Sequence, residues 1–239
     1  MPVVYHCTQI IHSWLYPPVC VLCGQAGSGD RDLCPACLAD LPFNHPACPR
    51  CAAPFAGATS GICGHCLHQP PQADAVFALL RYRSPVSELI RGLKFGGRLY
   101  VARLLGGLMA ERLAARGTAV PERIIPVPLH PRRQRQRGFN QALELARPIA
   151  RRLGAVLDHD TCRRTRNTRA QSELGARQRR TNVRGAFAAT GRLEARHVAV
   201  VDDVITTGHT TDELARLLKT HGAERVEVWA AARAVAREP

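Results

Sequence analysis

The stretch from residue 197 to 219 constrains the fold more than any other part of the chain, because strand, acid, turn and helix patterns follow one another within it. Val198–Val201 is an uninterrupted apolar run, rich in β-branched residues, which is typical of a strand buried on both faces of a parallel sheet. Asp202 and Asp203 follow where we expect that strand to end. Leucines at helical spacing begin after a short turn.

The turn between this strand and helix offers the groups that bind a sugar phosphate. It consists of Thr206, Thr207, Gly208, His209 and Thr210. A helix N-terminus presents free backbone N–H groups and the positive end of the helix dipole, and glycine allows close approach. Ionised carboxylates accept hydrogen bonds from a sugar diol. We therefore predict a ribose 5-phosphate site. The alternative, an ordinary strand-end turn with Thr206 as N-cap, is disfavoured because all the parts occur in the required order.

Length and charge limit the class of protein. With 239 residues and 46% hydrophobic content, the chain can bury one core and a small additional module. The sequence lacks the ~18 consecutive apolar residues of a membrane span and has no secretory signal pattern. We therefore expect a cytoplasmic protein without membrane insertion. The net charge of +14 predicts anionic partners, either phosphorylated metabolites or nucleic acid.

Eight of the ten cysteines form four Cys-x-x-Cys pairs near the N-terminus. The pairs are Cys20/Cys23, Cys34/Cys37, Cys48/Cys51 and Cys63/Cys66. In a reducing compartment, tandem thiolate pairs favour tetrahedral zinc over disulfides or a redox role. We predict two structural zinc ions in a module spanning residues 1–70, closed by Pro70-Pro71. Spacing leaves two arrangements open, either consecutive pairs or a cross-braced pairing of first with third and second with fourth.

Residues 71–239 show strand and helix patterns in alternation, which favours an α/β domain with a parallel sheet. Expected strands lie at residues 75–82, 124–127, 198–201 and 225–232. Expected helices begin near Val86, Leu99 and Gln141, and the second extends to about Ala115, with Gly106-Gly107 unfavourable for helix in its middle. Prolines at 126 and 128 indicate a strand end followed by a fixed turn.

Two arginine-rich segments could either bind an anionic ligand or simply form solvated surface. Arg132, Arg133, Arg135 and Arg137 can clamp phosphate oxygens or simply form a solvated basic face, and we prefer Arg137 and Asn140 as contacts. Residues 163–184 hold eight arginines against one acid and almost no apolar residues. That composition predicts a loop between two strands, which either closes over a substrate or holds a nucleic-acid backbone.

Several motifs together resemble the ComF family of competence-associated proteins. They are the cysteine pairs, Leu-Lys-Phe-x-Gly-Arg at 93–98, Pro-Val-Pro-Leu-His-Pro at 126–131, Arg-x-Arg-Gly-Phe-Asn-Gln at 135–141, Arg-Arg-x-Asn-Val-Arg-Gly-Ala-Phe at 179–187 and Val-Val-Asp-Asp-Val-Ile-Thr-Thr-Gly at 200–208. The resemblance implies an N-terminal double zinc ribbon and a type I phosphoribosyltransferase-like domain. It also implies a role in the uptake of single-stranded DNA during natural transformation.

The resemblance assigns roles to the site residues. Magnesium-bound phosphoribosyl pyrophosphate (PRPP), or a related phosphorylated ribose, would be the ligand. Asp202 and Asp203 would hold the ribose hydroxyls as catalytic residues, and Thr206–Thr210 would anchor the 5-phosphate. Pyrophosphate would meet Pro128, Leu129, His130, Arg137 and Lys94. His209 departs from the alanine common in this loop, which leaves the backbone donors unaffected.

Two other interpretations compete with a transferase whose acceptor is unidentified. One is a non-catalytic protein that senses PRPP or a nucleotide and grips single-stranded DNA through its zinc module and arginine-rich loop. The other is an adaptor that recruits a helicase-like partner of the uptake machinery, which rests on the resemblance alone.

Overall fold

The computed structural model describes residues 17–57, 60–167 and 183–234 and divides the chain into two compact units. The first unit, Met1–Pro42, contains the short helix α2 (Pro35–Ala39) and the first four paired cysteines. The second unit, Phe43–Pro239, contains the other four paired cysteines, helix α3 (Gly64–His68) and the main sheet. No helix in the described ranges is both long and apolar enough to cross a bilayer.

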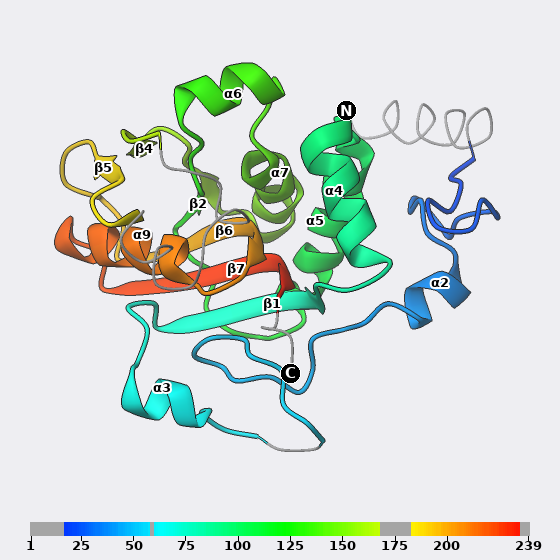
Figure 1. Cartoon of the computed structure of the whole chain (residues 1–239), viewed down its shortest axis with the longest axis horizontal. Coiled ribbons are helices and arrows are strands. Elements are labelled where there is room, and N and C mark those ends of the chain that lie inside the picture. Colours follow the sequence, from blue (N-terminus) through cyan, green and yellow to red (C-terminus); the bar gives the residue numbers. More distant parts are fainter. Residues whose placement is uncertain (1–16, 58–59, 168–182, 235–239) are drawn as a thin grey trace. The chain divides into compact units, whose positions relative to one another are not determined.

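A five-stranded sheet forms the centre of the second unit (Figure 1). Its strands are β1 (Ala75–Arg81), β2 (Arg123–Pro126), β3 (Val156–Leu157), β6 (His197–Ile205) and β7 (Arg225–Arg233). They are arranged in the order β1-β7-β6-β2-β3, and every neighbouring pair is parallel. The expected α/β architecture with a parallel sheet is confirmed.

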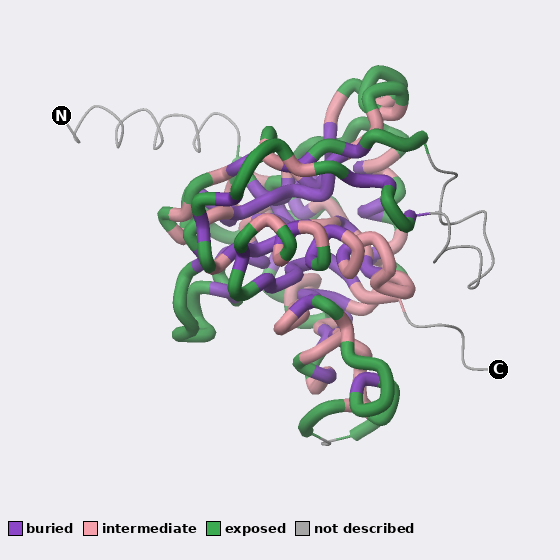
Figure 2. Tube along the Cα trace, turned by 90° about the vertical axis from the view of Figure 1, so that its left-hand side faces the viewer, coloured by how far each residue is buried: buried purple, intermediate pink, exposed green. Residues whose placement is uncertain are grey.

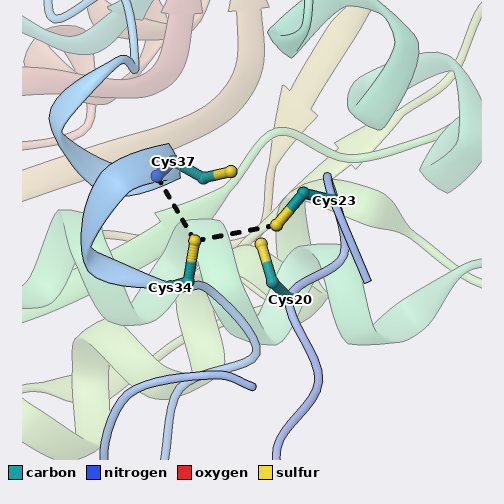
Figure 3. A group of neighbouring side chains, drawn as sticks. All are labelled: Cys20, Cys23, Cys34 and Cys37. Atoms are coloured by element: carbon teal, nitrogen blue, oxygen red, sulfur yellow. Dashed lines mark hydrogen bonds between the residues drawn. The ribbon is translucent and has the colours of Figure 1, made fainter. Parts of the chain in front are cut away.

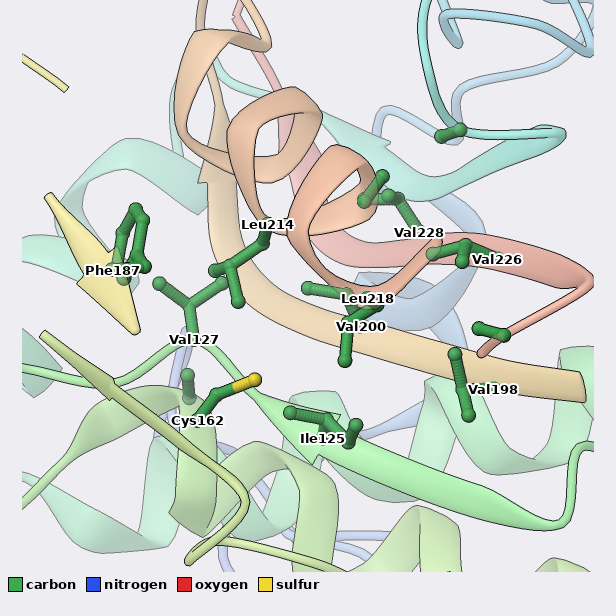
Figure 4. Close-up of a cluster of buried hydrophobic side chains, with 14 of the residues drawn as sticks. Ile125, Val127, Cys162, Phe187, Val198, Val200, Leu214, Leu218, Val226 and Val228 are labelled. Atoms are coloured by element: carbon green, nitrogen blue, oxygen red, sulfur yellow. The ribbon is translucent and has the colours of Figure 1, made fainter. Parts of the chain in front are cut away.

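Helices cover both faces of this sheet. The helices after β1 are α4 (Val86–Gly96), α5 (Leu99–Ala114), α6 (Pro131–Arg137), α7 (Gln141–Leu153) and α9 (His209–Thr220), of which α5, α7 and α9 pack on its strands. Helices α5 and α7 pack against each other, whereas the apolar stripe of α9 packs on β6 and β7 (Figure 4). Helix α5 continues through Gly106-Gly107 without a break.

The core is built from the alternation of side chains along the strands. Val198 and Val200 of β6 are fully buried and join Leu214 and Leu218 of α9 in one apolar cluster (Figure 4). Successive side chains of a strand point to opposite faces of the sheet, so Ala199 and Val201 lie on the other face. They are also fully buried. Strand β6 is therefore buried along most of its length, and Figure 2 shows buried segments running through the interior of the molecule.

Two local features differ from the sequence expectations, and a third agrees with them. Strand β6 does not end before the acids but continues through Asp202 and Asp203 to Ile205. The basic run after His130 forms helix α6. The arginine-rich segment connects two short antiparallel strands, β4 (Cys162–Arg164) and β5 (Phe187–Ala189), as expected for a loop between strands, but residues 168–182 lie outside the described part.

Candidate functional site

The eight paired cysteines gather into two clusters of four, Cys20/Cys23/Cys34/Cys37 and Cys48/Cys51/Cys63/Cys66. Within each cluster all four sulfur atoms lie within 4.8 Å of one another. Figure 3 shows the first cluster, with its side chains gathered together. The Sγ atoms of Cys23 and Cys34 are 3.7 Å apart, as are those of Cys51 and Cys63. Thiolates bound tetrahedrally at ~2.3 Å from zinc are separated by about 3.8 Å. The consecutive arrangement therefore holds, and each cluster fits a structural zinc ion.

The second cysteine cluster is hydrogen-bonded to the sheet of its own unit. The Arg50 side chain, between Cys48 and Cys51, donates to the backbone carbonyl of Asp74 at 2.8 Å. The Val76 N–H of β1 donates to the Pro49 carbonyl at 2.8 Å. The Arg233 side chain of β7 donates to the Cys51 carbonyl at 3.0 Å. Hydrogen bonds therefore connect the Cys48–Cys51 segment directly to strands β1 and β7.

The carboxyl ends of β6 and β2 form the place where a ligand is expected in this topology. From β6 the chain passes through α9 to β7 on one side, and from β2 it passes through α7 to β3 on the other. Crevices at such reversals of direction are the usual ligand sites of open α/β sheets. The acid pair lies on β6, and the loop Val127–His130 follows β2, so the topology brings both predicted segments to this edge.

Asp202 and Asp203 occupy different surroundings because the strand continues through them. Neighbouring side chains on a strand leave it on opposite faces. Asp203 is only 3% exposed, and its Oδ2 atom lies 2.9 Å from Nζ of Lys94 on α4. Lys94, predicted as a pyrophosphate contact, is therefore paired with an acid in this structure.

The charges of these three residues are coupled. Burial together with the negative charge of Asp203 raises the pKa of Asp202 to about 7, against the opposing attraction of Lys94. Burial alone would lower the pKa of Lys94, but the attraction of Asp203 outweighs it, so the Lys94 pKa lies above its ordinary value. The site consequently holds a charged lysine beside one carboxylate and a second carboxyl that titrates near neutrality.

The predicted phosphate turn leads into α9 with an uncapped N-terminus. Gly208 occupies the cap position in the left-handed conformation, with φ of 83°, and no side chain caps the helix. Within the described residues, the Oγ1 atom of Thr207 is buried and has no hydrogen-bond partner. An unsatisfied buried hydroxyl beside a helix N-terminus that no side chain caps is an arrangement that suits a phosphate.

The segment after β2 is held by its own polar side chains. His130 caps α6 by accepting a hydrogen bond from the Arg132 N–H at 3.2 Å. Asn140 is buried, caps α7 by accepting from the Ala142 N–H at 3.0 Å, and donates to the Val127 carbonyl at 3.1 Å. Both polar atoms of the Asn140 side chain therefore bond to the backbone and hold the loop Val127–His130 in place. They are not directed at a ligand, contrary to the expectation for Asn140.

Two arginines supply positive charge near the acids. Arg137 lies over the ring of Phe95 at 5.7 Å from its centroid and donates to the Gln141 side chain. Arg164 of β4 is 8% exposed and lies over the ring of Phe187 at 5.3 Å. Burial and the nearby Arg133 lower the Arg164 pKa to about 10, whereas Asp202 opposes that shift. Sequence reasoning counted Arg164 among the loop arginines, because nothing in the local pattern distinguishes a buried one.

A half-open cavity of about 450 Å³ adjoins the first turns of α9. Its walls include His209, Asp212 and Arg216 of the helix, opposite Gln72 and Arg184. The Oδ1 atom of Asp212 accepts a hydrogen bond from the Gln72 N–H. His209, the unusual residue of the turn, thus lines open space and not the apolar core.

Known proteins resemble this chain over both of its parts. A double zinc ribbon domain model matches residues 11–67, and a phosphoribosyl transferase domain model matches residues 140–238. The chain is 40% identical over 215 residues to DNA utilization protein YhgH of Escherichia coli, covering 88% of each. It is 36% identical over 223 residues to Competence protein F of Haemophilus influenzae, covering 90% of this chain and 96% of the relative.

Solved structures match the transferase part at low similarity. Purine phosphoribosyltransferase from Pyrococcus horikoshii is 18% identical, with a TM-score of 0.34, and the match covers 57% of this chain and 90% of that one.

Proposed function

This chain belongs to the ComF family, and from that premise we propose that it binds magnesium-bound PRPP and serves the uptake of single-stranded DNA in natural transformation. The observation that carries the ligand proposal is the entrance of α9. There a glycine with positive φ, a helix N-terminus without a side-chain cap and the unpaired Thr207 hydroxyl follow a few residues after the two acids on β6. This arrangement suits a 5-phosphate next to a ribose diol.

Each group of residues has a separate task in this proposal. The turn Thr206–Thr210 holds the 5-phosphate through backbone N–H groups and the Thr207 hydroxyl. Asp202 and Asp203 accept hydrogen bonds from the ribose hydroxyls. The loop Pro128–His130, with Lys94 and Arg137, binds pyrophosphate, and Lys94 exchanges its contact with Asp203 for one with the ligand. Magnesium bound with PRPP would neutralise charge on the departing pyrophosphate.

In the transferase form of the proposal, pyrophosphate departs and an acceptor attacks the sugar carbon from the opposite face. The ribose then carries positive charge in the transition state, which the carboxylates of Asp202 and Asp203 stabilise. Lys94 and Arg137 stabilise the negative charge that develops on pyrophosphate. The acceptor is not specified by any residue of the site.

Calorimetric titration of the full chain with PRPP and magnesium tests the binding proposal. Replacing both acids, Asp202→Asn with Asp203→Asn, should weaken PRPP binding at least tenfold and leave the zinc content unchanged. Val204→Ala, on the same strand, serves as a control for packing loss. Equal PRPP affinity in the wild type and the double variant would reject the assignment. Pyrophosphate release on adding candidate nucleobases separates a transferase from a sensor.

The exposed basic surface of α6 favours a second candidate function, a non-catalytic PRPP- or nucleotide-sensing protein that holds single-stranded DNA. Arg132 and Arg135 are exposed on this helix, and the whole chain carries a net charge of +14. Binding of this kind is mainly electrostatic and steeply dependent on salt. Fluorescence anisotropy with a labelled single strand at 50 to 200 mM salt tests it, with Arg132→Gln and Arg135→Gln expected to reduce the salt slope.

The proposal also assigns separate roles to the two parts of the chain. Residues 1–70 act as the zinc module and residues 71–239 as the phosphoribosyltransferase-like domain. The zinc module would dock a helicase-like partner of the uptake machinery, and the protein would act in the cytoplasm, where thiolates remain reduced and available to zinc. Co-purification of a helicase with the wild type, lost when the cysteines are replaced, tests the docking step.

A further inference from the structure

One arginine side chain is hydrogen-bonded both to the second zinc cluster and to the phosphate turn. Arg233 is the last residue of β7. Its Nε donates to the Cys51 carbonyl at 3.0 Å. Its Nη1 donates to the Ile205 carbonyl at 3.1 Å, to the Thr206 carbonyl, and to its neighbour Ala234 at 2.8 Å. Cys51 is a ligand of the second cluster, and Thr206 begins the phosphate turn, so one guanidinium joins the two.

The charge of the second cluster and the carbonyl oxygens of the turn explain why position 233 is an arginine. A zinc ion with four thiolates carries a net charge of about −2, which attracts a nearby cation. The fork of a guanidinium can serve several carbonyl oxygens at once, which the single ammonium of lysine does less well. Arg233 also stands beside Ile205 in the β6–β7 register, so the strand pairing fixes the origin of its side chain.

Holding the Thr206 carbonyl sets the direction of the next amide. The peptide group is planar and trans, so the carbonyl of Thr206 and the N–H of Thr207 point in opposite directions. With the carbonyl turned towards Arg233, the Thr207 N–H points away from the guanidinium. The Ile205 carbonyl before it accepts from both Arg233 and the Ala234 N–H, so the strand pairing and the guanidinium together orient the Thr206 N–H. Arg233 is therefore the side chain that holds the amide between Thr206 and Thr207, in the turn that is proposed to bind phosphate.

We propose that Arg233 is a positioning residue that couples the second zinc cluster to the sugar-phosphate site, so that each ligand strengthens the binding of the other. The proposal rests on the proposed binding of a ribose phosphate at Thr206–Thr210. With zinc bound, the Cys48–Cys51 knuckle is rigid and its Cys51 carbonyl keeps Arg233 in place. Without zinc, the knuckle loosens and the turn loses its external support. Because such coupling is reciprocal, occupancy of the turn must also tighten zinc binding.

Two cysteine double variants compare the coupled cluster with the uncoupled one. The probe is ribose 5-phosphate, titrated calorimetrically, since it addresses the turn without pyrophosphate. Cys63→Ser with Cys66→Ser removes the second zinc and should weaken ribose 5-phosphate binding about tenfold. Cys34→Ser with Cys37→Ser removes the first zinc and should leave the affinity unchanged. Equal effects of the two variants would overturn the proposal.

The variant Arg233→Met tests the connection directly. It should weaken ribose 5-phosphate binding about as much as loss of the second zinc, and combining both changes should weaken it no further. Arg233→Lys should recover part of the affinity, which a purely structural defect would not predict. Additive losses, or an unchanged affinity in Arg233→Met, would contradict the coupling. Failure of the wild type itself to bind ribose 5-phosphate or PRPP would instead refute the proposed function.

Zinc release supplies a readout that is independent of the affinity measurement and of the folding of the second-cluster variant. In the chain with Cys34→Ser and Cys37→Ser, the remaining zinc belongs to the second cluster. Magnesium-bound PRPP should slow its transfer to a colorimetric chelator about tenfold, and adding Arg233→Met should abolish that protection. Protection of the same size in both chains would show that the arginine does not carry the coupling.

Discussion

At the scale of single residues, the acid pair shows how one strand gives two identical side chains different properties. Asp203 faces Lys94 at 2.9 Å, whereas the pKa of Asp202 is raised to about 7 by burial and by the charge of Asp203. Protonation of Asp202 removes an acceptor that the ribose diol needs. PRPP affinity should therefore rise with pH through 7 and level off above it.

The expected size follows from the ionised fraction of Asp202. With a pKa of about 7, that fraction increases about tenfold between pH 6 and pH 8. Calorimetry with magnesium and PRPP across this range measures the effect. Asp202→Asn cannot titrate and should bind weakly with a flatter profile, which also corrects for titration of the ligand's own phosphate. A wild-type profile as flat as that of the variant would contradict the prediction.

Thr207 offers a second test at this scale, because its buried hydroxyl lacks a partner among the described residues. Thr207→Val keeps the shape and removes the hydroxyl. Loss of a hydrogen bond to a charged ligand group costs about 1.5–3 kcal/mol, so PRPP affinity should fall roughly tenfold to a hundredfold. The melting temperature should stay the same or rise, because no hydrogen bond within the described protein is lost. A lower melting temperature with unchanged affinity would assign the hydroxyl a structural role.

The sequence predicted which residues gather at this site better than it predicted their contacts. Asp202, Asp203 and the glycine turn could be named because strand, acids and helix follow one another in the sequence, and their role in binding stays a prediction. The pairing of Lys94 with Asp203 was not foreseen, since the two residues are far apart in the chain. Arg164 and Arg233 were missed for the same reason, because their burial and partners depend on tertiary packing.

At the scale of elements, the contact between α5 and α7 depends on one of two adjacent glycines. A Cβ atom on Gly106 would lie 2.5 Å from Pro148 Cγ and 2.6 Å from the Leu145 carbonyl oxygen. A Cβ atom on Gly107 would meet nothing within 4 Å. Gly106→Ala should lower the free energy of unfolding by about 1–3 kcal/mol through overpacking.

Gly107→Ala provides the matched control in the same helix. It should raise the free energy of unfolding by up to about 1 kcal/mol, because alanine favours helix more than glycine does. Chemical denaturation of the three proteins measures both changes. If Gly106→Ala were as stable as Gly107→Ala, the close approach of α5 and α7 would not be a constraint on the sequence.

Long, periodic elements were predicted well, and short or irregular ones were not. Helices α4, α5 and α7 and strands β1 and β7 lie within about two residues of their expected bounds. Helix α6 was missed because its arginines show no apolar period, although His130 as cap and Pro131 at the first turn are start signals. The end of β6 was placed too early because acids were taken to end a strand that tertiary pairing in fact continues.

At the scale of the whole molecule, the structure resolves the cysteine arrangement that spacing left open. In the consecutive pairing 10 and 11 residues separate the joined cysteine pairs, and in the cross-braced pairing 24 and 25 do. Either pairing therefore gives two similar sites, and only three-dimensional proximity could decide between them. Each cluster takes two consecutive pairs, with the first in the unit Met1–Pro42 and the second in the unit Phe43–Pro239. The two zinc sites are therefore expected to be independent of each other as metal sites.

Independence of the two zinc sites leads to a test by substitution of one whole cluster. Metal analysis of the wild type should find two zinc ions per chain. Replacing Cys20, Cys23, Cys34 and Cys37 by serine should leave one tightly bound zinc, because the second cluster keeps all four ligands. A cross-braced arrangement would leave each site with only two thiolates and lose both ions. The remaining zinc should also preserve the thermal unfolding transition of the second unit, since its knuckle is hydrogen-bonded to β1 and β7.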